Sequence, residues 1–146
     1  MSSKIFCFSE LSRQLIREGH CVHFLARGNS MKPFIQPETA MLVENVPICD
    51  LIKGDVVLYS SSHPQVTAHR LIGFNQTAHE IELITAADND TLGTSFVSQN
   101  HYIGKVTPAT IEWGARHRFA GLLWYYLRPI RRLKRVTQTR LSSLIR

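Results

Sequence analysis

The chain has 146 residues, 44% of them hydrophobic and 19% charged, and a formal net charge of +6. This length and composition favour one globular domain that buries its own core and needs neither disulfides nor structural metals to fold. The three cysteines form no C-x-x-C pair, which argues against a disulfide framework and against a zinc knuckle.

The N-terminal residues do not predict an export signal. The apolar stretch before Ser9 and Glu10 is too short for a secretory signal or a membrane anchor. The odd number of cysteines suits a reducing compartment. We therefore expect a cytoplasmic protein, with peripheral association at the inner membrane face as the alternative location.

The basic residues are concentrated at the C-terminal end. From Arg116 onward there are nine basic residues and no acidic one, whereas the rest of the chain holds eight basic and eleven acidic residues, a net charge of −3. This asymmetry predicts two parts, a mildly acidic domain at 1–113 and a basic tail at 114–146.

The first half of the chain predicts one helix and three strands. Ser9 to Glu18 has helical apolar spacing, with Ser9 as a candidate N-cap and Gly19 as a stop. Residues 20–26 alternate in hydrophobicity, and residues 40–46 form a second strand pattern. The unbroken apolar run at 56–59 predicts a strand that is buried on both faces.

The second half predicts a hairpin and a last strand. Residues 65–74 and 79–85 alternate on either side of a turn and should pair with each other. Residues 88–99 suggest an irregular segment, and 101–113 a strand broken by Gly104 and Pro108. With a single N-terminal helix, these short strands predict a mainly β fold.

The tail predicts an amphipathic helix that Pro129 interrupts. Its apolar positions recur at intervals of three and four: Leu122, Leu123, Tyr126, Leu127, Ile130, Leu133 and Val136. Such a helix suits the surface of an anionic membrane, or it packs on its own domain or on a partner protein. Arginines also bind phosphate, but no nucleic-acid motif accompanies them, so we do not expect nucleic acid as a partner.

The segment Gly28-Asn29-Ser30-Met31-Lys32-Pro33 breaks the strand pattern that precedes it. A serine at such a break is a candidate nucleophile, although the same residues also form ordinary turns. A serine hydroxyl attacks a substrate only when a base accepts its proton. The sequence therefore has to supply that base elsewhere.

Five short motifs follow one another between residues 28 and 106. They are Gly28-x-Ser30-Met31-x-Pro33, Lys53-Gly54-Asp55-Val56-Val57, His69-Arg70-Leu71-Ile72-Gly73, Thr85-Ala86-Ala87-Asp88-Asn89-Asp90 and Ile103-Gly104-Lys105-Val106. Together these motifs resemble the ordered motifs of the signal peptidase I family, within the wider group that includes the self-cleaving SOS repressors. The resemblance implies a β-rich peptidase domain with a serine nucleophile.

The resemblance assigns a role to each site residue. Ser30 corresponds to the nucleophile, and His69 takes the position of the general base, as in the histidine variant of the family. Asp88 aligns with the acidic residue that would orient His69, and Asp90 is the alternative. A neutral imidazole accepts the serine proton near pH 7, and a carboxylate on its other nitrogen fixes the tautomer.

The substrate and oxyanion region would comprise Gly28, Asn29 and Met31. Two features depart from the family pattern. Ala86 and Ala87 replace the usual Lys-Gly pair, and Gly28 replaces a hydroxyl residue that helps to bind the oxyanion. Backbone N–H groups, such as that of Ser30, would then stabilise the oxyanion.

We therefore expect a serine endopeptidase that cleaves a leader or pro-segment of a peptide or protein, without a cofactor or metal. The alternative is a non-catalytic module with the peptidase fold, which docks on a membrane or a protein partner through its basic tail. The remaining histidines have no metal-ligand spacing, so they suggest surface or strand positions.

Overall fold

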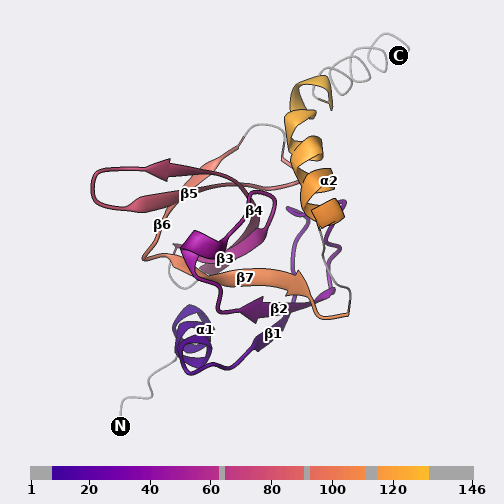
Figure 1. Ribbon diagram of the computed structural model, residues 1–146. Coiled ribbons are helices and arrows are strands. Elements are labelled where there is room, and N and C mark those ends of the chain that lie inside the picture. Colours follow the sequence, from indigo (N-terminus) through magenta and orange to yellow (C-terminus); the bar gives the residue numbers. More distant parts are fainter. Residues whose placement is uncertain (1–7, 63–64, 91–92, 111–114, 132–146) are drawn as a thin grey trace.

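The computed structural model describes residues 8–62, 65–90, 93–110 and 115–131, and the fold is mainly β (Figure 1). Seven antiparallel strands form one curled, half-barrel sheet in the order β1-β2-β7-β3-β4-β5-β6. In Figure 1, helix α1 lies at one end of the molecule and helix α2 at the other. The predicted mainly β class is therefore confirmed.

The helices are α1 (Phe8–Arg17), the 3-10 helix η1 (Ile48–Asp50) and α2 (Ala115–Tyr126). The strands are β1 (Val22–Leu25), β2 (Ala40–Glu44), β3 (Val56–Ser62), β4 (Gln65–Gln76), β5 (Ile81–Ala86), β6 (Ser95–Ser98) and β7 (Tyr102–Pro108).

The predicted hairpin is confirmed, because β4 and β5 pair antiparallel, with Arg70 opposite Ala86. The irregular segment predicted at 88–99 is wrong in part. Residues 95–98 form β6, which pairs with β5 and places Val97 opposite Leu83. Both of these side chains are buried in one cluster. A run of four residues is too short for hydrophobic periodicity to identify a strand. Residues 95–98 form a strand because they pair with β5.

Strand β7 differs from its predicted limits because it runs through Gly104 and ends at Pro108; residues 111–113 of the predicted strand lie outside the described residues. A Cβ added at Gly104 would lie 2.7 Å from the carbonyl oxygen of Glu44 on β2. The glycine therefore permits a close approach of two paired strands instead of breaking one of them.

Strand β3 is buried on both faces, as the apolar run at 56–59 predicts. Val56 and Leu58 pack in one cluster, together with Met31 and Met41. The alternate residues Val57 and Tyr59 pack in a second cluster with Leu71, Leu83 and Val97. The sheet thus has two cores, and the β1–β2 loop contributes to the first through Met31.

Helix α1 packs against the first core through Ile16, and its Arg13 side chain donates to the carbonyl of Tyr102 at 2.9 Å. The predicted helix is confirmed within one residue at either end. Ser9 lies inside the first turn and is buried, so the predicted N-cap role is wrong. The helix covers the cluster to which β1 and β2 also contribute.

Helix α2 packs against the rest of the domain. Arg118 forms an ion pair with Asp55 at 3.7 Å, and the indole of Trp124 donates to the carbonyl of Asp88 at 2.9 Å. The helix ends at Tyr126, before Pro129. Within the described part of the chain, no helix is long and apolar enough to cross a membrane.

Candidate active site

Ser30 lies on the long loop between β1 and β2. Gly28 has a φ of +77°, and a Cβ there would meet nothing within 4 Å. The glycine is therefore required for its left-handed backbone conformation and not to avoid a steric clash. Ser30 is exposed, whereas Met31 and Ile35 on either side of the next turn are buried in the first core. The loop is therefore anchored by its apolar side chains while the Ser30 hydroxyl faces solvent.

Backbone hydrogen bonds hold the loop at both its base and its tip. At the base, the amide of Ala26 donates to the carbonyl of Thr39 at 2.9 Å, and the amide of Glu38 donates to the carbonyl of Ala26 at 2.8 Å. At the tip, the amide of Asn89 donates to the carbonyl of Ser30 at 2.8 Å. The serine is thus fixed against the segment that follows β5.

The residues proposed for the oxyanion region have available backbone donors. Among the described residues, no amide from 28 to 31 donates a hydrogen bond to a protein acceptor. The amides of Ser30 and Met31 are therefore free to donate to a substrate oxygen, which is the requirement for oxyanion stabilisation. Met31 itself is 5% exposed, and its side chain packs in the first core.

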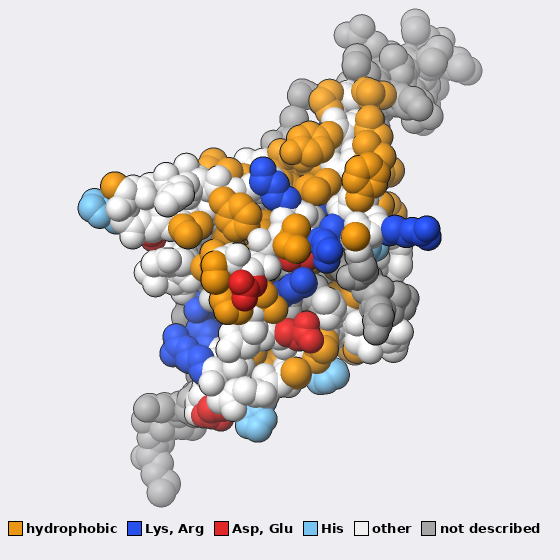
Figure 2. All heavy atoms as spheres, viewed as in Figure 1, with side chains coloured by type: hydrophobic (Ala, Val, Ile, Leu, Met, Phe, Trp, Pro, Cys, Tyr) orange, Lys and Arg blue, Asp and Glu red, His pale blue; other side chains and the backbone are white. Residues whose placement is uncertain are grey.

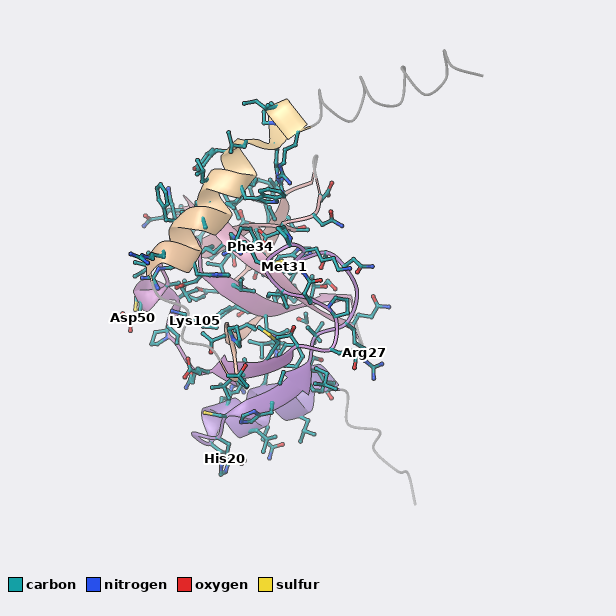
Figure 3. All side chains as sticks on the ribbon, turned by 90° about the vertical axis from the view of Figure 1, so that its right-hand side faces the viewer. His20, Arg27, Met31, Phe34, Asp50 and Lys105 are labelled. Atoms are coloured by element: carbon teal, nitrogen blue, oxygen red, sulfur yellow. The ribbon has the colours of Figure 1, made fainter. Side chains whose placement is uncertain are left out.

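Ser30 lines a cleft with a volume of about 690 Å³. The other lining residues are mostly apolar, and they come from the Ser30 loop and from strands on either side of it. Thr67 and Ala68, the two residues that precede His69 on β4, also line the cleft. In Figure 3, the labels of Met31 and Phe34 mark the position of the loop that carries Ser30. The further lining residues include Phe24, Ile35, Met41 and Leu58.

His69 is half-buried on β4, opposite Val57 of β3. Its Nδ1 lies 3.0 Å from the hydroxyl oxygen of Tyr59, and the Thr85 hydroxyl donates to that same oxygen at 3.4 Å. Tyr59 belongs to the second core, whereas Ala68 packs against the first. The side chains of His69 and Ala68 therefore lie on opposite faces of β4, as alternation along a strand requires.

The environment of His69 favours its neutral form. Burial lowers the pKa of the imidazole, the charge of Asp90 raises it, and the charge of Arg128 lowers it further. The net direction is downward from 6.5. At neutral pH the ring is therefore deprotonated and able to accept a proton.

Asp88, predicted to orient His69, forms a different contact. Both of its carboxylate oxygens accept hydrogen bonds from Arg70, at 2.8 Å from Nε and 2.7 Å from Nη2. The two side chains are 0% and 2% exposed. Burial raises the pKa of the Asp88 carboxyl, while the Arg70 guanidinium opposes this. Asp88 thus holds Arg70, and Tyr59 occupies the Nδ1 position that the sequence analysis gives to a carboxylate.

Asp90, the predicted alternative, is exposed, and one carboxylate oxygen accepts a hydrogen bond from the amide of Gly93 at 3.1 Å. Its charge acts on His69. The adjacent Asn89 binds the Ser30 carbonyl. One short segment, Asn89-Asp90, therefore influences both members of the predicted pair.

The structure brings the Ser30 loop to Asn89 and to a cleft that Thr67 and Ala68 also line. The His69 side chain contacts Tyr59 on the face of β4 opposite Ala68, so the structure does not bring the Ser30 hydroxyl and the imidazole together. No hydrogen bond connects the Ser30 hydroxyl to His69 in the described part of the chain. Catalytic hydrogen bonds are often long without substrate and shorten when it binds. The described residues also contain no group of three or more His, Cys, Asp or Glu that could hold a metal.

Sequence reasoning missed Tyr59, Trp124 and Arg128 as neighbours of the site. Arg128 is buried and donates to the carbonyls of Ala87 and Gly93, on either side of the 88–90 segment. Among the residues that surround the site, only Arg70 could be recognised from local sequence, because it follows His69 within the third motif. The contacts of α2 arise from chain segments more than 30 residues apart, which periodicity does not detect.

No protein-family model matches this sequence, and none of the curated proteins searched matches it significantly.

Proposed function

We propose that this protein is a serine endopeptidase with a signal peptidase-like β domain, in which Ser30 is the nucleophile and His69 the general base. The observation that carries the proposal is an exposed serine that lines a largely apolar cleft and has unpaired backbone amides around it. The same serine is fixed against the segment whose Asp90 acts on His69.

The reaction would proceed through an acyl-enzyme. Nε2 of His69 takes the Ser30 proton as Oγ attacks the peptide carbonyl, and the backbone amides of the loop stabilise the oxyanion. His69 then gives that proton to the leaving amine. A water molecule, deprotonated by the same imidazole, hydrolyses the ester and restores Ser30.

Tyr59 would replace the orienting carboxylate. When the neutral imidazole carries its proton on Nδ1, this N–H donates to the Tyr59 oxygen at 3.0 Å and leaves Nε2 as the acceptor. A phenol does not neutralise an imidazolium as a carboxylate does. This arrangement therefore predicts a weaker base than a full Ser-His-Asp triad.

The cleft suits a peptide or protein substrate. A volume of about 690 Å³ with a largely apolar lining accommodates several side chains of an extended segment, such as a leader or pro-segment. Ser30 lines this cleft, so a carbonyl of a bound peptide could approach its hydroxyl. The location of the enzyme would be the cytoplasm or the inner face of the membrane.

An acylating activated-ester probe tests the proposal. We expect the wild-type protein to be labelled, Ser30→Ala to lose labelling, and His69→Gln to be labelled about 100-fold or more slowly, the usual contribution of a general base. Ser95→Ala, an exposed serine whose side chain accepts no described hydrogen bond, is the matched control and should be labelled like the wild type. Equal labelling of the wild type and Ser30→Ala would exclude Ser30 as the nucleophile.

The second candidate function is a non-catalytic binding module that keeps this fold. It is favoured by the direct contact of His69 with Tyr59. It is also favoured because the His69 side chain lies on the face of β4 opposite Ala68, which lines the cleft. Such a module would bind a peptide in the cleft without cleaving it. Absent labelling of the wild type, combined with peptide binding that is abolished by Leu25→Glu, at a cleft residue that is 52% exposed, would support this candidate instead.

A further inference from the structure

Helix α2 has one face that contacts the domain and one that is exposed to solvent. The inner face, which contacts the domain, carries arginines and one aromatic residue. Arg118 binds Asp55, Trp124 donates to Asp88, and Arg128 donates to Ala87. Charged side chains on a surface helix ordinarily meet water. Here Arg118 and Arg128 contact the protein, while several large apolar side chains of the same segment are exposed.

The outward face of α2 and the short segment 127–130 after it form a continuous apolar stripe, which we call the outer stripe. Its residues recur at helical spacing, and Figure 2 shows hydrophobic side chains gathered over α2. Phe119 is 68% exposed, Tyr126 64% and Ile130 54%. Large apolar side chains exposed together usually mark an interaction site. The stripe consists of Phe119, Leu123, Tyr126, Leu127 and Ile130.

The charge around the outer stripe indicates its occupant. No acidic residue follows Glu112 in the sequence, while five basic residues occur between 132 and 146 alone. Arg116, in the first turn of α2, is exposed. The apolar spacing of the stripe also continues in the sequence at Leu133 and Val136. An exposed apolar surface in a segment whose sequence carries only positive charge complements an anionic lipid surface.

The same charges disfavour a second copy of this chain as the occupant. Two such stripes laid together would bring like charges side by side, with no acid available from this segment to compensate. Aromatic residues at the edge of the stripe also favour the boundary between headgroups and acyl chains, where an amphipathic ring is most stable.

We propose that α2 docks this protein on an anionic membrane by inserting the outer stripe among the lipid headgroups. The helix is too short to span, so the protein would lie on the surface. The inner face meanwhile holds the 87–90 segment and packs Trp124 against Phe34 of the Ser30 loop, with ring centroids 6.2 Å apart. The cleft would thus be held at a constant position relative to the lipid. This inference does not depend on the catalytic proposal.

Vesicle co-sedimentation with the full chain tests the proposal. We expect the wild-type protein to sediment with equimolar phosphatidylcholine and phosphatidylglycerol vesicles, to sediment less as salt rises, and to remain largely in solution with pure phosphatidylcholine. Replacing two stripe residues, Phe119→Glu with Ile130→Glu, should weaken partitioning about tenfold or more, because two large apolar groups no longer insert.

Phe96→Glu is the matched control. Phe96 lies on β6 and is 62% exposed, close to the value for Phe119, but it is outside the outer stripe. We expect this variant to sediment like the wild type, and denaturant titration checks that all variants are folded. The proposal is overturned if the wild type does not sediment with anionic vesicles, if the stripe variant binds them equally well, or if the wild type is a dimer that the stripe variant dissociates.

Discussion

At the scale of single residues, the site depends on how one histidine is surrounded. His69 contacts the Tyr59 hydroxyl through Nδ1 and responds to the charge of Asp90, whereas the Asp88 carboxylate is used by Arg70. Because its hydrogen-bond partner is a neutral hydroxyl, burial is the largest influence on the pKa of the imidazole. The lowered pKa of His69 therefore follows from desolvation that no contacting carboxylate offsets.

This environment predicts the pH dependence of Ser30 acylation. Because burial lowers the pKa of His69, we expect the acid limb of the labelling rate to have its midpoint below 6.5. Asp90→Asn removes the charge that raises this pKa, so its midpoint should be lower still. The asparagine side-chain oxygen can still accept the Gly93 amide.

Labelling rates measured between pH 4 and pH 8 check this prediction. Asp50→Asn, at an exposed acid on η1, serves as the control and should leave the midpoint unchanged. A wild-type midpoint above 6.5, or one that does not respond to Asp90→Asn, would contradict the assigned environment.

At the scale of elements, the contact between α2 and β4 determines how the site is held. Arg70 is fully buried and is bound by Asp88 and by the carbonyl of Gly54 at 2.7 Å. Gly121 of α2 packs directly on this guanidinium, and a Cβ built at Gly121 would overlap it. The glycine is therefore required by close packing, although it lowers the intrinsic stability of the helix.

Gly121→Ala separates these two effects, because they have opposite signs. Helix propensity alone would stabilise the variant by about 1 kcal/mol. We expect instead a loss of about 1 to 3 kcal/mol in the free energy of unfolding, since Arg70 has no room to move and α2 must shift. Urea titration measures the change.

Leu123→Ala, two positions further along α2 on the outer stripe, is the control and should change the free energy of unfolding by no more than about 0.5 kcal/mol. A Gly121→Ala protein as stable as the wild type would show that α2 does not pack on Arg70 as described.

At the scale of the whole molecule, the pH dependence of stability reports on the docked helix. His117 lies on α2 against the ring of Phe34, with centroids 5.1 Å apart. Burial lowers the pKa of His117 to about 4, and the charge of Arg70 lowers it as well. In the unfolded chain this pKa returns to near 6.5, so the unfolded state binds more protons between these values.

We therefore expect the free energy of unfolding to fall as pH decreases from 6.5 toward 4. His69 contributes in the same direction, because its pKa is also lowered. The raised pKa of Asp88 acts in the opposite direction near the acid end of this range and is unchanged by a substitution at 117. His117→Gln removes one of the two histidine contributions and should make the decline shallower, as measured by urea titration at each pH. Identical pH profiles for His117→Gln and the wild type would contradict the buried position of His117.

Much of the fold could be predicted from local patterns. The apolar run of β3 predicts a strand that is buried on both faces. Strands β4 and β5 alternate in hydrophobicity on either side of a turn, so their pairing could be predicted. Strand β6 could not be predicted, since its four residues form a strand only because β5 offers a free edge. The predicted break at Gly104 was wrong for a related reason, as a glycine within a paired strand has the same local signal as one in a turn.

For the site, the sequence by itself determined that Ser30 follows a glycine-broken strand, that His69 precedes an arginine on another strand, and that the C-terminal segment is basic and amphipathic. These features depend on composition and short spacing. Only the tertiary structure decided that Asp88 binds Arg70, that Tyr59 contacts His69, and that Arg118 and Arg128 contact the domain while the outer stripe is exposed. The physical reason is that a buried charge or an apolar face takes its partner from whatever the fold brings near, and those partners are far away in the sequence.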